Sequence, residues 1–264
     1  MRQVPDFKKT PKHQKKICMI TCYDYPSAKI ISNTDVDWIL VGDSVAMVVH
    51  GHEHTTMATM DMMLLHTKAV ARGAQHQPII TDLPFLCHRG SLNETIKHTR
   101  ALIQAGAHAI KIEGGDEKTC RTIHHLTTSG IPIMGHIGLT PQAVLQLGGY
   151  RVQGKSSDDA ERLMKEAHAL EAAGCFAVVL ECIPSLVAKN ITEALSIPVI
   201  GIGAGVETDG QVLVWHDLLG LQTELKPRFV KQYLQGQKVL TEAIHTYATE
   251  VHNQAFPCLE HAFS

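Results

Sequence analysis

Seven polar residues follow or end short apolar runs of the chain, and their types could support acid–base or metal chemistry. They are Asp43, Ser44, Asp82, Lys111, Glu113, His136 and Glu181. Lys111 and Glu113 are two residues apart, so in a strand their side chains point to the same face. An aspartate after a strand is usually a helix N-cap or a turn residue, and a Lys–Glu pair can simply fill a core. Five consecutive runs that each end in such a group favour a shared site instead.

Three of these residues offer only oxygen ligands. Asp43 and Asp82, with Glu113 behind them, form a set of the kind that suits Mg²⁺, which binds through one or two carboxylates plus substrate and water oxygens. A metal chelated by the carboxylate and keto oxygens of a 2-oxo acid would stabilise an enolate at the neighbouring carbon. The sequence therefore predicts metal-assisted aldol-type chemistry.

The remaining polar residues could complete such a site. Lys111 can neutralise the carboxylate or oxyanion of a substrate, and Ser44 can donate a hydrogen bond to it. Glu181 ends an apolar run and is suited to act as a base. His136 follows the fifth run and is expected in the same pocket.

Alternating strands and helices would bring these residues together. The apolar runs predict strands buried on both faces of a parallel sheet, at 17–22, 38–42, 78–81, 109–112, 132–135, 176–180 and 198–202. Amphipathic segments between them predict helices, the clearest at 60–72, 91–105, 157–173 and 185–194, several followed by a glycine at 73, 106, 130 or 174. An α/β fold with a (β/α)₈ barrel is expected, and in such barrels chemistry sits at the carboxyl ends of the strands.

The eighth strand is the difficult assignment. Residues 212–215 have strand-like composition but come too soon after the seventh strand for a helical crossover. We therefore predict a helix over 210–219, with Asp209 as N-cap and Gly220 after its end, then a strand near 228–233 and a last helix over 239–251. The residues up to Gln14 would be an extra N-terminal segment, and one domain would cover 1–264.

Composition narrows the possible partners and location. The net charge of −2 and the lack of a basic stripe argue against nucleic acid, and no apolar run is long enough to span a bilayer or form a leader. A cytoplasmic protein is therefore expected. The seven cysteines are odd in number and form no CxxC pair, and because disulfides are rare in reducing compartments we expect reduced, mostly buried thiols. His50, His52 and His54 could bind zinc, but a histidine-rich polar loop is the favoured interpretation.

Ordered motifs across the chain resemble one enzyme family. They are TCYDY (21–25), VGDS (41–44), HTKAV (66–70), DLPF (82–85), IKIEGG (110–115), GHIGLTPQ (135–142), GGYRVQG (148–154), LEC (180–182), IGIGAG (200–205) and DGQ (209–211). From about residue 16 to 263, the sequence resembles the ketopantoate hydroxymethyltransferases.

The resemblance implies a fold, an assembly and a reaction. The fold would be a (β/α)₈ TIM barrel of the phosphoenolpyruvate/pyruvate type, assembled as a homodecamer of two pentameric rings. The reaction would transfer a hydroxymethyl group from 5,10-methylenetetrahydrofolate to 3-methyl-2-oxobutanoate and give 2-dehydropantoate.

The resemblance also implies roles for the polar residues. Asp43 and Asp82 would bind Mg²⁺ directly, with Glu113 near the metal through water. Glu181 would accept the C3 proton of the acid. The contacts to the 2-oxo acid would be Asp43, Ser44, Asp82 and Lys111, with His136 in the same pocket.

Some positions depart from the family's pattern, and two other functions stay open. The departures lie in the loops after the second and third strands, at Ala46, His54, Thr56, Met57, Leu86, Cys87 and His88. A related metal-dependent 2-oxo acid lyase or mutase is the enzymatic alternative, although its Gly-rich loop with a cysteine is not found. A catalytically weak paralogue that binds a 2-oxo acid is the other alternative, and retention of the whole polar set argues against it.

Overall fold

The structure is a computed structural model that describes the chain apart from residues 1–6, 8–14, 223–226 and 264. Its contacts divide the chain into two compact units, Met1–Val214 and Trp215–Ser264. The first unit is the barrel and carries all the predicted site residues. The single domain expected over 1–264 stays a prediction.

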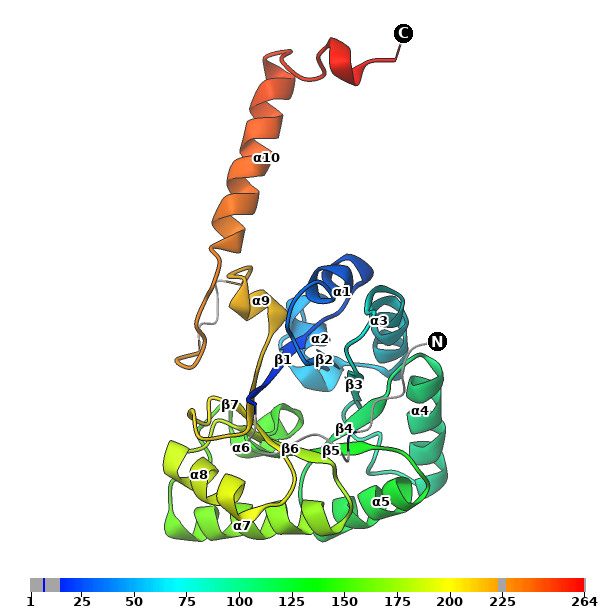
Figure 1. Cartoon of the computed structure of the whole chain (residues 1–264), viewed down its shortest axis with the longest axis vertical. Coiled ribbons are helices and arrows are strands. Elements are labelled where there is room, and N and C mark those ends of the chain that lie inside the picture. The colour runs from blue at the N-terminus through cyan, green and yellow to red at the C-terminus, as the bar shows by residue number, and fades with distance from the viewer. Residues whose placement is uncertain (1–6, 8–14, 223–226, 264) are drawn as a thin grey trace. The chain divides into compact units, whose positions relative to one another are not determined.

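Eight parallel strands close into a barrel in the order in which they occur along the chain (Figure 1). They are β1 (Ile17–Thr21), β2 (Trp38–Val41), β3 (Ile79–Asp82), β4 (Ala109–Glu113), β5 (Ile133–Gly138), β6 (Ala177–Glu181), β7 (Val199–Ile202) and β8 (Gly210–Leu213). Parallel pairing of β8 with both β1 and β7 completes the ring. The predicted (β/α)₈ barrel and its first seven strands are confirmed.

Helices cover the outside of this barrel. They are α1 (Tyr25–Ile31), α2 (Val45–Val48), α3 (Met60–Gly73), α4 (Leu92–Gln104), α5 (Glu117–Thr128), α6 (Val144–Leu147), α7 (Ser157–Ala172) and α8 (Ser185–Ala194), with short 3₁₀ turns η2 (Thr55–Met57) and η3 (Pro141–Ala143). Side-chain caps start several of them, because Ser91 and Ser156 accept hydrogen bonds from the backbone three residues later.

Glycine lies at the end of four helices as expected, but only three of these glycines have the left-handed conformation of a C-cap. Gly106, Gly130 and Gly174 adopt positive φ after α4, α5 and α7. Gly73 is instead the last residue of α3 and lacks a positive φ, and a Cβ atom there would come within 2.5 Å of the carbonyl oxygen of Tyr25. This glycine therefore allows α1 and α3 to approach closely.

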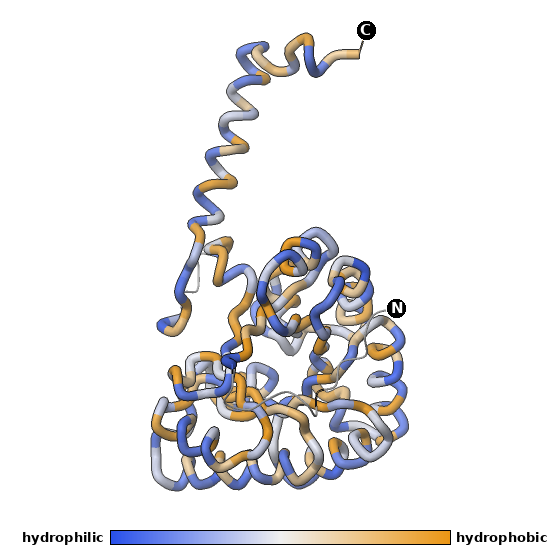
Figure 2. Tube along the Cα trace, viewed as in Figure 1, coloured by the Kyte–Doolittle hydropathy of each residue, from blue (hydrophilic) through white to orange (hydrophobic). Residues whose placement is uncertain are grey.

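Apolar strand residues fill the barrel and the layer beneath the helices, as the hydropathy colouring of the strands shows (Figure 2). At the amino end of the strands, Phe7 stacks on Phe176 with ring centroids 4.2 Å apart and meets Trp38 edge-on at 6.1 Å. Phe7 is the part of the predicted N-terminal segment that the structure describes; the rest of that segment lies outside the described residues. These aromatic rings close the end of the barrel opposite the polar residues.

The prediction for the eighth strand is wrong. Residues 210–213 form β8, and the helix that follows is only α9 (Trp215–Leu218). Residues 228–233 form a turn and irregular chain rather than a strand. Gly220 does follow a helix with φ +63°, and the predicted last helix lies within α10 (Gly236–His252).

The short connection between β7 and β8 explains the error. The crossover rule assumes a helix between parallel strands, but residues 203–209 return without one. Because β7 has only four residues, an extended return at about 3.3–3.6 Å per residue is long enough. Asp209, predicted as a helix cap, instead accepts a hydrogen bond from the amide of Val199 at 2.9 Å and so secures the return.

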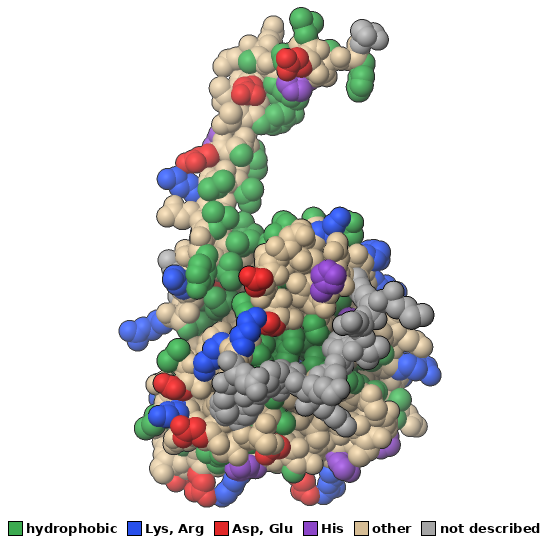
Figure 3. Space-filling model, in the orientation of Figure 1, with side chains coloured by type: hydrophobic (Ala, Val, Ile, Leu, Met, Phe, Trp, Pro, Cys, Tyr) green, Lys and Arg blue, Asp and Glu red, His purple; other side chains and the backbone are tan. Residues whose placement is uncertain are grey.

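The second unit consists of α9, α10 and the 3₁₀ turn η4 (Leu259–His261). Apolar side chains lie along α10 and are visible in the space-filling view (Figure 3). One stripe of them, at the i, i+4, i+7 and i+11 positions of a single helix face, is exposed: Leu240, Ile244, Tyr247 and Val251. Among the described residues, no helix has the length and apolarity to span a membrane.

All seven cysteines are free thiols, as predicted, but only Cys22 and Cys175 are buried. The expectation that most would be buried is therefore wrong. Several lie in loops and on helix surfaces that the composition alone does not identify.

Candidate active site

The carboxyl ends of the strands gather every predicted site residue. The strand register pairs Asp82 with Lys111 and Glu113 with His136, so these side chains are neighbours across the sheet. The next pairing sets Glu181 beside Gly138 at the end of β5. Because a glycine stands there, no side chain separates Glu181 from the neighbouring strand.

Asp82 joins three strands at this rim. Its Oδ1 accepts a hydrogen bond from Lys111 Nζ at 2.6 Å, and its Oδ2 accepts one from the backbone amide of Asp43 at 3.0 Å. All three residues are buried. Because both oxygens of Asp82 accept a hydrogen bond from a buried donor, the orientation of this carboxylate is fixed.

Gln142, which the sequence interpretation missed, connects the carboxylates of two strands. Its side-chain amide donates to Asp43 Oδ2 at 2.8 Å and to the carbonyl of Leu83 at 3.0 Å. Its backbone amide donates to Glu113 Oε2 at 3.0 Å. Gln142 is the last residue of the motif at 135–142, and membership of that motif was the one sequence feature that pointed to a functional role.

His136 lies between two carboxylates. Its Nδ1 is 3.4 Å from Glu113 Oε1 and its Nε2 is 3.3 Å from Glu181 Oε2. Burial and Lys111 act to lower the pKa of His136, yet Glu113 and Glu181 raise it to about 9. Burial likewise would raise the pKa of Glu113, but the hydrogen bond and charge of His136 bring it below its ordinary value. A protonated His136 therefore orients both carboxylates.

Two tyrosines complete the rim. Tyr23, after β1, shares a hydrogen bond of 2.8 Å with Ser44 Oγ, which places the predicted donor Ser44 beside the aspartates. Tyr150 lies in the motif at 148–154; burial raises the pKa of its phenol, and the charge of Glu181 raises it further. Neither tyrosine was singled out from the sequence, although each belongs to a motif that was.

The histidine-rich loop after β2 contacts the same rim from outside. His50 Nε2 is 2.9 Å from Nε2 of His66, a residue of α3, and His66 donates through Nδ1 to the carbonyl of Tyr23 at 2.6 Å. This chain of hydrogen bonds ties the loop and α3 to the end of β1. His50 thus has a structural partner that the local sequence did not reveal.

The charges at the rim suit a divalent cation. Burial and the carboxylates of Asp82 and Glu113 raise the pKa of Asp43 well above its ordinary value. Burial alone would lower the pKa of Lys111, but the surrounding carboxylates hold it above its ordinary value. Lys111 and His136 therefore face a larger number of carboxylates, and Asp43 is the one whose ionised form is most disfavoured.

The carboxylate oxygens at the rim are of the kind that Mg²⁺ binds. Among the residues that the structure describes, no three His, Cys, Asp or Glu side chains stand in a ready-made metal cage. Mg²⁺ does not require one, because it keeps several waters and uses one or two carboxylates. Asp43 and Asp82 provide two neighbouring hard oxygen donors, and a bound cation would favour the ionised form of Asp43 that burial and the other carboxylates disfavour.

Other solved barrels share this fold. Phosphoenolpyruvate phosphomutase from Streptomyces platensis subsp. rosaceus superposes with a TM-score of 0.65 at 14% identity, over 98% of this chain and 90% of that one. A 2,3-dimethylmalate lyase, described as a member of the phosphoenolpyruvate mutase/isocitrate lyase superfamily, gives 0.60 at 16% identity, over 98% and 89%. The barrel thus has the fold of that superfamily, as predicted.

Closer relatives give the family. The family model for ketopantoate hydroxymethyltransferase matches residues 2–258. The 3-methyl-2-oxobutanoate hydroxymethyltransferase of Legionella pneumophila (strain Corby) is 59% identical over 99% of this chain and 100% of its own length. That of Francisella tularensis subsp. holarctica (strain OSU18) is 52% identical over 100% and 99%. The chain belongs to the ketopantoate hydroxymethyltransferase family, and the prediction of a transferase is confirmed.

Proposed function

We propose that this chain transfers a hydroxymethyl group from 5,10-methylenetetrahydrofolate to 3-methyl-2-oxobutanoate and produces 2-dehydropantoate, with Mg²⁺ as cofactor. The names of the relatives suggest the acid and the transferred group. The observation that carries the mechanism is the buried rim in which paired aspartates, a lysine and a base converge. The reaction would then be the metal-assisted aldol chemistry expected from the residue types.

The acid would bind at the paired aspartates. Asp43 and Asp82 would hold the Mg²⁺, with Glu113 near it, and the ion when bound would supply Lewis-acid polarisation of the 2-oxo group. Lys111, fixed by its 2.6 Å bond to Asp82, would face the acid's oxygens with a permanent positive charge. Ser44, oriented by Tyr23, would donate a hydrogen bond to the same molecule.

Glu181 would take the proton from C3. Its Oε2 lies 3.3 Å from His136 Nε2, and the other carboxylate oxygen would accept the proton. The C3–H bond breaks and its proton passes to Glu181, while C3 forms a new bond to the methylene carbon of the carrier. Both C–N bonds of that carbon break, and the two nitrogens take up the proton from Glu181 and one proton of water. Water supplies the hydroxyl oxygen, and the carrier leaves as tetrahydrofolate.

Production of 2-dehydropantoate tests this proposal. Purified protein, Mg²⁺, 3-methyl-2-oxobutanoate and methylenetetrahydrofolate are expected to give that product. No turnover with either Mg²⁺ or Co²⁺ would reject the proposal, and cleavage of a larger 2-oxo acid without the carrier would favour a lyase.

The base assignment has its own test. The variant Glu181→Gln is expected to lose C3 deuterium exchange in 3-methyl-2-oxobutanoate, which needs no carrier. Glu193→Gln, on the exposed face of α8, is the matched control and keeps the exchange. Exchange at the normal rate in Glu181→Gln would show that another group is the base.

We also propose that the enzyme is a cytoplasmic homodecamer. The support for assembly is the exposed apolar stripe of α10, which water would otherwise solvate at a cost in free energy. Ile244→Glu, in the middle of the stripe, is expected to lower the mass measured by light scattering. Thr249→Glu, on the opposite face of the helix, serves as the control; a decamer that persists in Ile244→Glu would exclude this stripe from the interface.

A further inference from the structure

A cavity of about 590 Å³ opens directly beside the catalytic rim, within the barrel unit. It lies among the loops after β3, β4 and β5. Its lining includes Glu113 and Gln142, which also bind His136 and Asp43. Because His136 links Glu113 on the cavity wall to the base Glu181, a ligand in this cavity would lie close to the site of proton transfer.

The mouth of the cavity is apolar. Phe85, Leu86 and Leu145 line it and remain 37%, 56% and 73% exposed. Large exposed apolar side chains that border a cavity commonly mark a ligand-binding surface. The volume also falls within the range of about 300–1,000 Å³ that holds a molecule much larger than a small 2-oxo acid.

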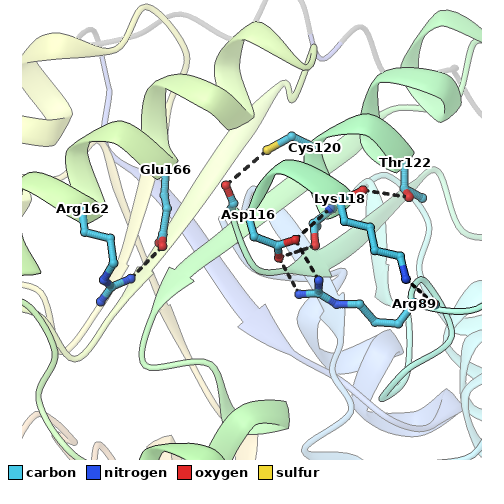
Figure 4. Close-up of polar contacts among 9 residues, drawn as sticks. Arg89, Asp116, Lys118, Cys120, Thr122, Arg162 and Glu166 are labelled. Carbon is cyan, nitrogen blue, oxygen red and sulfur yellow. Dashed lines mark hydrogen bonds and ion pairs between the residues drawn. The ribbon is translucent and has the colours of Figure 1, made fainter.

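The charged side of the cavity disfavours an anion. Arg89 is bound by both oxygens of Asp116, at 2.9 and 2.7 Å, and Figure 4 shows this pair beside Lys118, which donates to the Arg89 carbonyl. The guanidinium charge is therefore already compensated. Since Glu113 adds another carboxylate, the cavity suits an uncharged group with hydrogen-bonding edges.

His88 offers the hydrogen bonds that such a group needs. It lines the cavity, is only 4% exposed, and neither ring nitrogen has a hydrogen-bond partner. Burial and the charge of Arg89 lower its pKa to about 4, so the ring is neutral and has one donor and one acceptor. A buried polar group without partners costs free energy, which a ligand that bonds to it would recover.

We propose that this cavity receives the heteroaromatic ring of the one-carbon carrier, with His88 bonding to its polar edge and Leu145 and Phe85 packing on its faces. The inference rests on the proposed function, because it assumes that the second substrate is a reduced folate. The position follows from the chemistry: the methylene carbon has to reach C3 of the acid beside Glu181. His88 is then a specificity-determining residue for the carrier.

Binding of tetrahydrofolate to the Mg²⁺-loaded protein, by anaerobic calorimetry, tests this cavity. His88→Phe keeps a ring but has no donor or acceptor, and is expected to raise both the dissociation constant for tetrahydrofolate and the KM for methylenetetrahydrofolate at least tenfold. The KM for 3-methyl-2-oxobutanoate and its C3 deuterium exchange should stay unchanged. His76→Phe, exposed at the opposite end of the barrel, is the matched control.

A second variant guards against a folding effect at buried His88. Leu145→Asp places a charge at the exposed mouth and is expected to weaken tetrahydrofolate binding to a similar degree. Rescue by His88→Asn, which has a donor and an acceptor, would support hydrogen bonding rather than packing.

The outcomes separate the two proposals. Unchanged tetrahydrofolate binding and unchanged carrier KM in both His88→Phe and Leu145→Asp would overturn the cavity assignment, while wild-type turnover would leave the proposed function intact. If wild-type protein binds tetrahydrofolate but makes no 2-dehydropantoate, the proposed reaction fails; loss of binding in both variants would still support the cavity.

Discussion

Gln142 provides a sensitive test of how the rim is held together. In Gln142→Leu the side chain keeps its approximate size, and the backbone amide still donates to Glu113 at 3.0 Å. The side-chain bond to Asp43, 2.8 Å long, is lost together with the weaker bond to the Leu83 carbonyl. The variant therefore removes the restraint on one carboxylate and leaves the rest of the cluster in place.

The size of the effect follows from that bond. A hydrogen bond to a charged group contributes about 1.5–3 kcal/mol. Since about 1.4 kcal/mol corresponds to a factor of ten, Mg²⁺ binding should weaken roughly 10- to 150-fold. The pKa of Asp43, which Gln142 helps to lower, should rise further and shift the metal requirement to higher pH.

Mg²⁺ titration of C3 deuterium exchange measures this change without the carrier. Gln104→Leu, exposed at the end of α4, is the control. A half-saturating Mg²⁺ concentration within twofold of wild type in Gln142→Leu would refute the claim that Gln142 orients a metal ligand.

Three further predictions concern charge and packing. Because the pKa of His136 is raised to about 9 from 6.5, its contribution to the stability of the metal-free protein is fully present below about pH 6.5 and lost as the pH rises through 9. Urea unfolding across this range should show the loss in wild type and not in His136→Gln; parallel profiles would contradict it. Lys111→Met breaks a buried ion pair and should lower the free energy of unfolding by about 3–5 kcal/mol. Lys189→Met, at an exposed ion pair, is the control and should change that free energy much less. An unfolding midpoint in urea that does not move would show that Asp82 finds another partner. Phe7→Ala should cost about 3–5 kcal/mol in the same assay, because its ring is buried against Phe176 and Trp38, whereas Phe263→Ala, fully exposed, should be silent. Equal stability of the two variants would mean that the aromatic contacts at this end contribute nothing.

The sequence by itself determined the barrel and its polar rim. The run at 109–113, for example, is apolar except for Lys111 and Glu113. That pattern is typical of a strand that is buried on both faces and has polar residues toward its carboxyl end. Because all strands of a parallel barrel end at the same rim, residue type after each strand was enough to bring Asp43, Asp82 and Glu181 together. That inference needed no knowledge of contacts.

Only the tertiary structure showed which side chains bond to one another at the rim and how β8 closes the barrel. Gln142 and Asp43 are 99 positions apart in the sequence, and the residues around neither of them predict the hydrogen bond between them. β8 was missed although 212–215 has strand-like composition, because the crossover rule excluded a strand so soon after β7, and only the pairing with β1 and β7 shows that the short return is possible. His88 likewise becomes informative only when its buried, unpaired ring is found beside a cavity. Local sequence encodes each element's own periodicity, while pairing and burial depend on chain segments far apart in sequence.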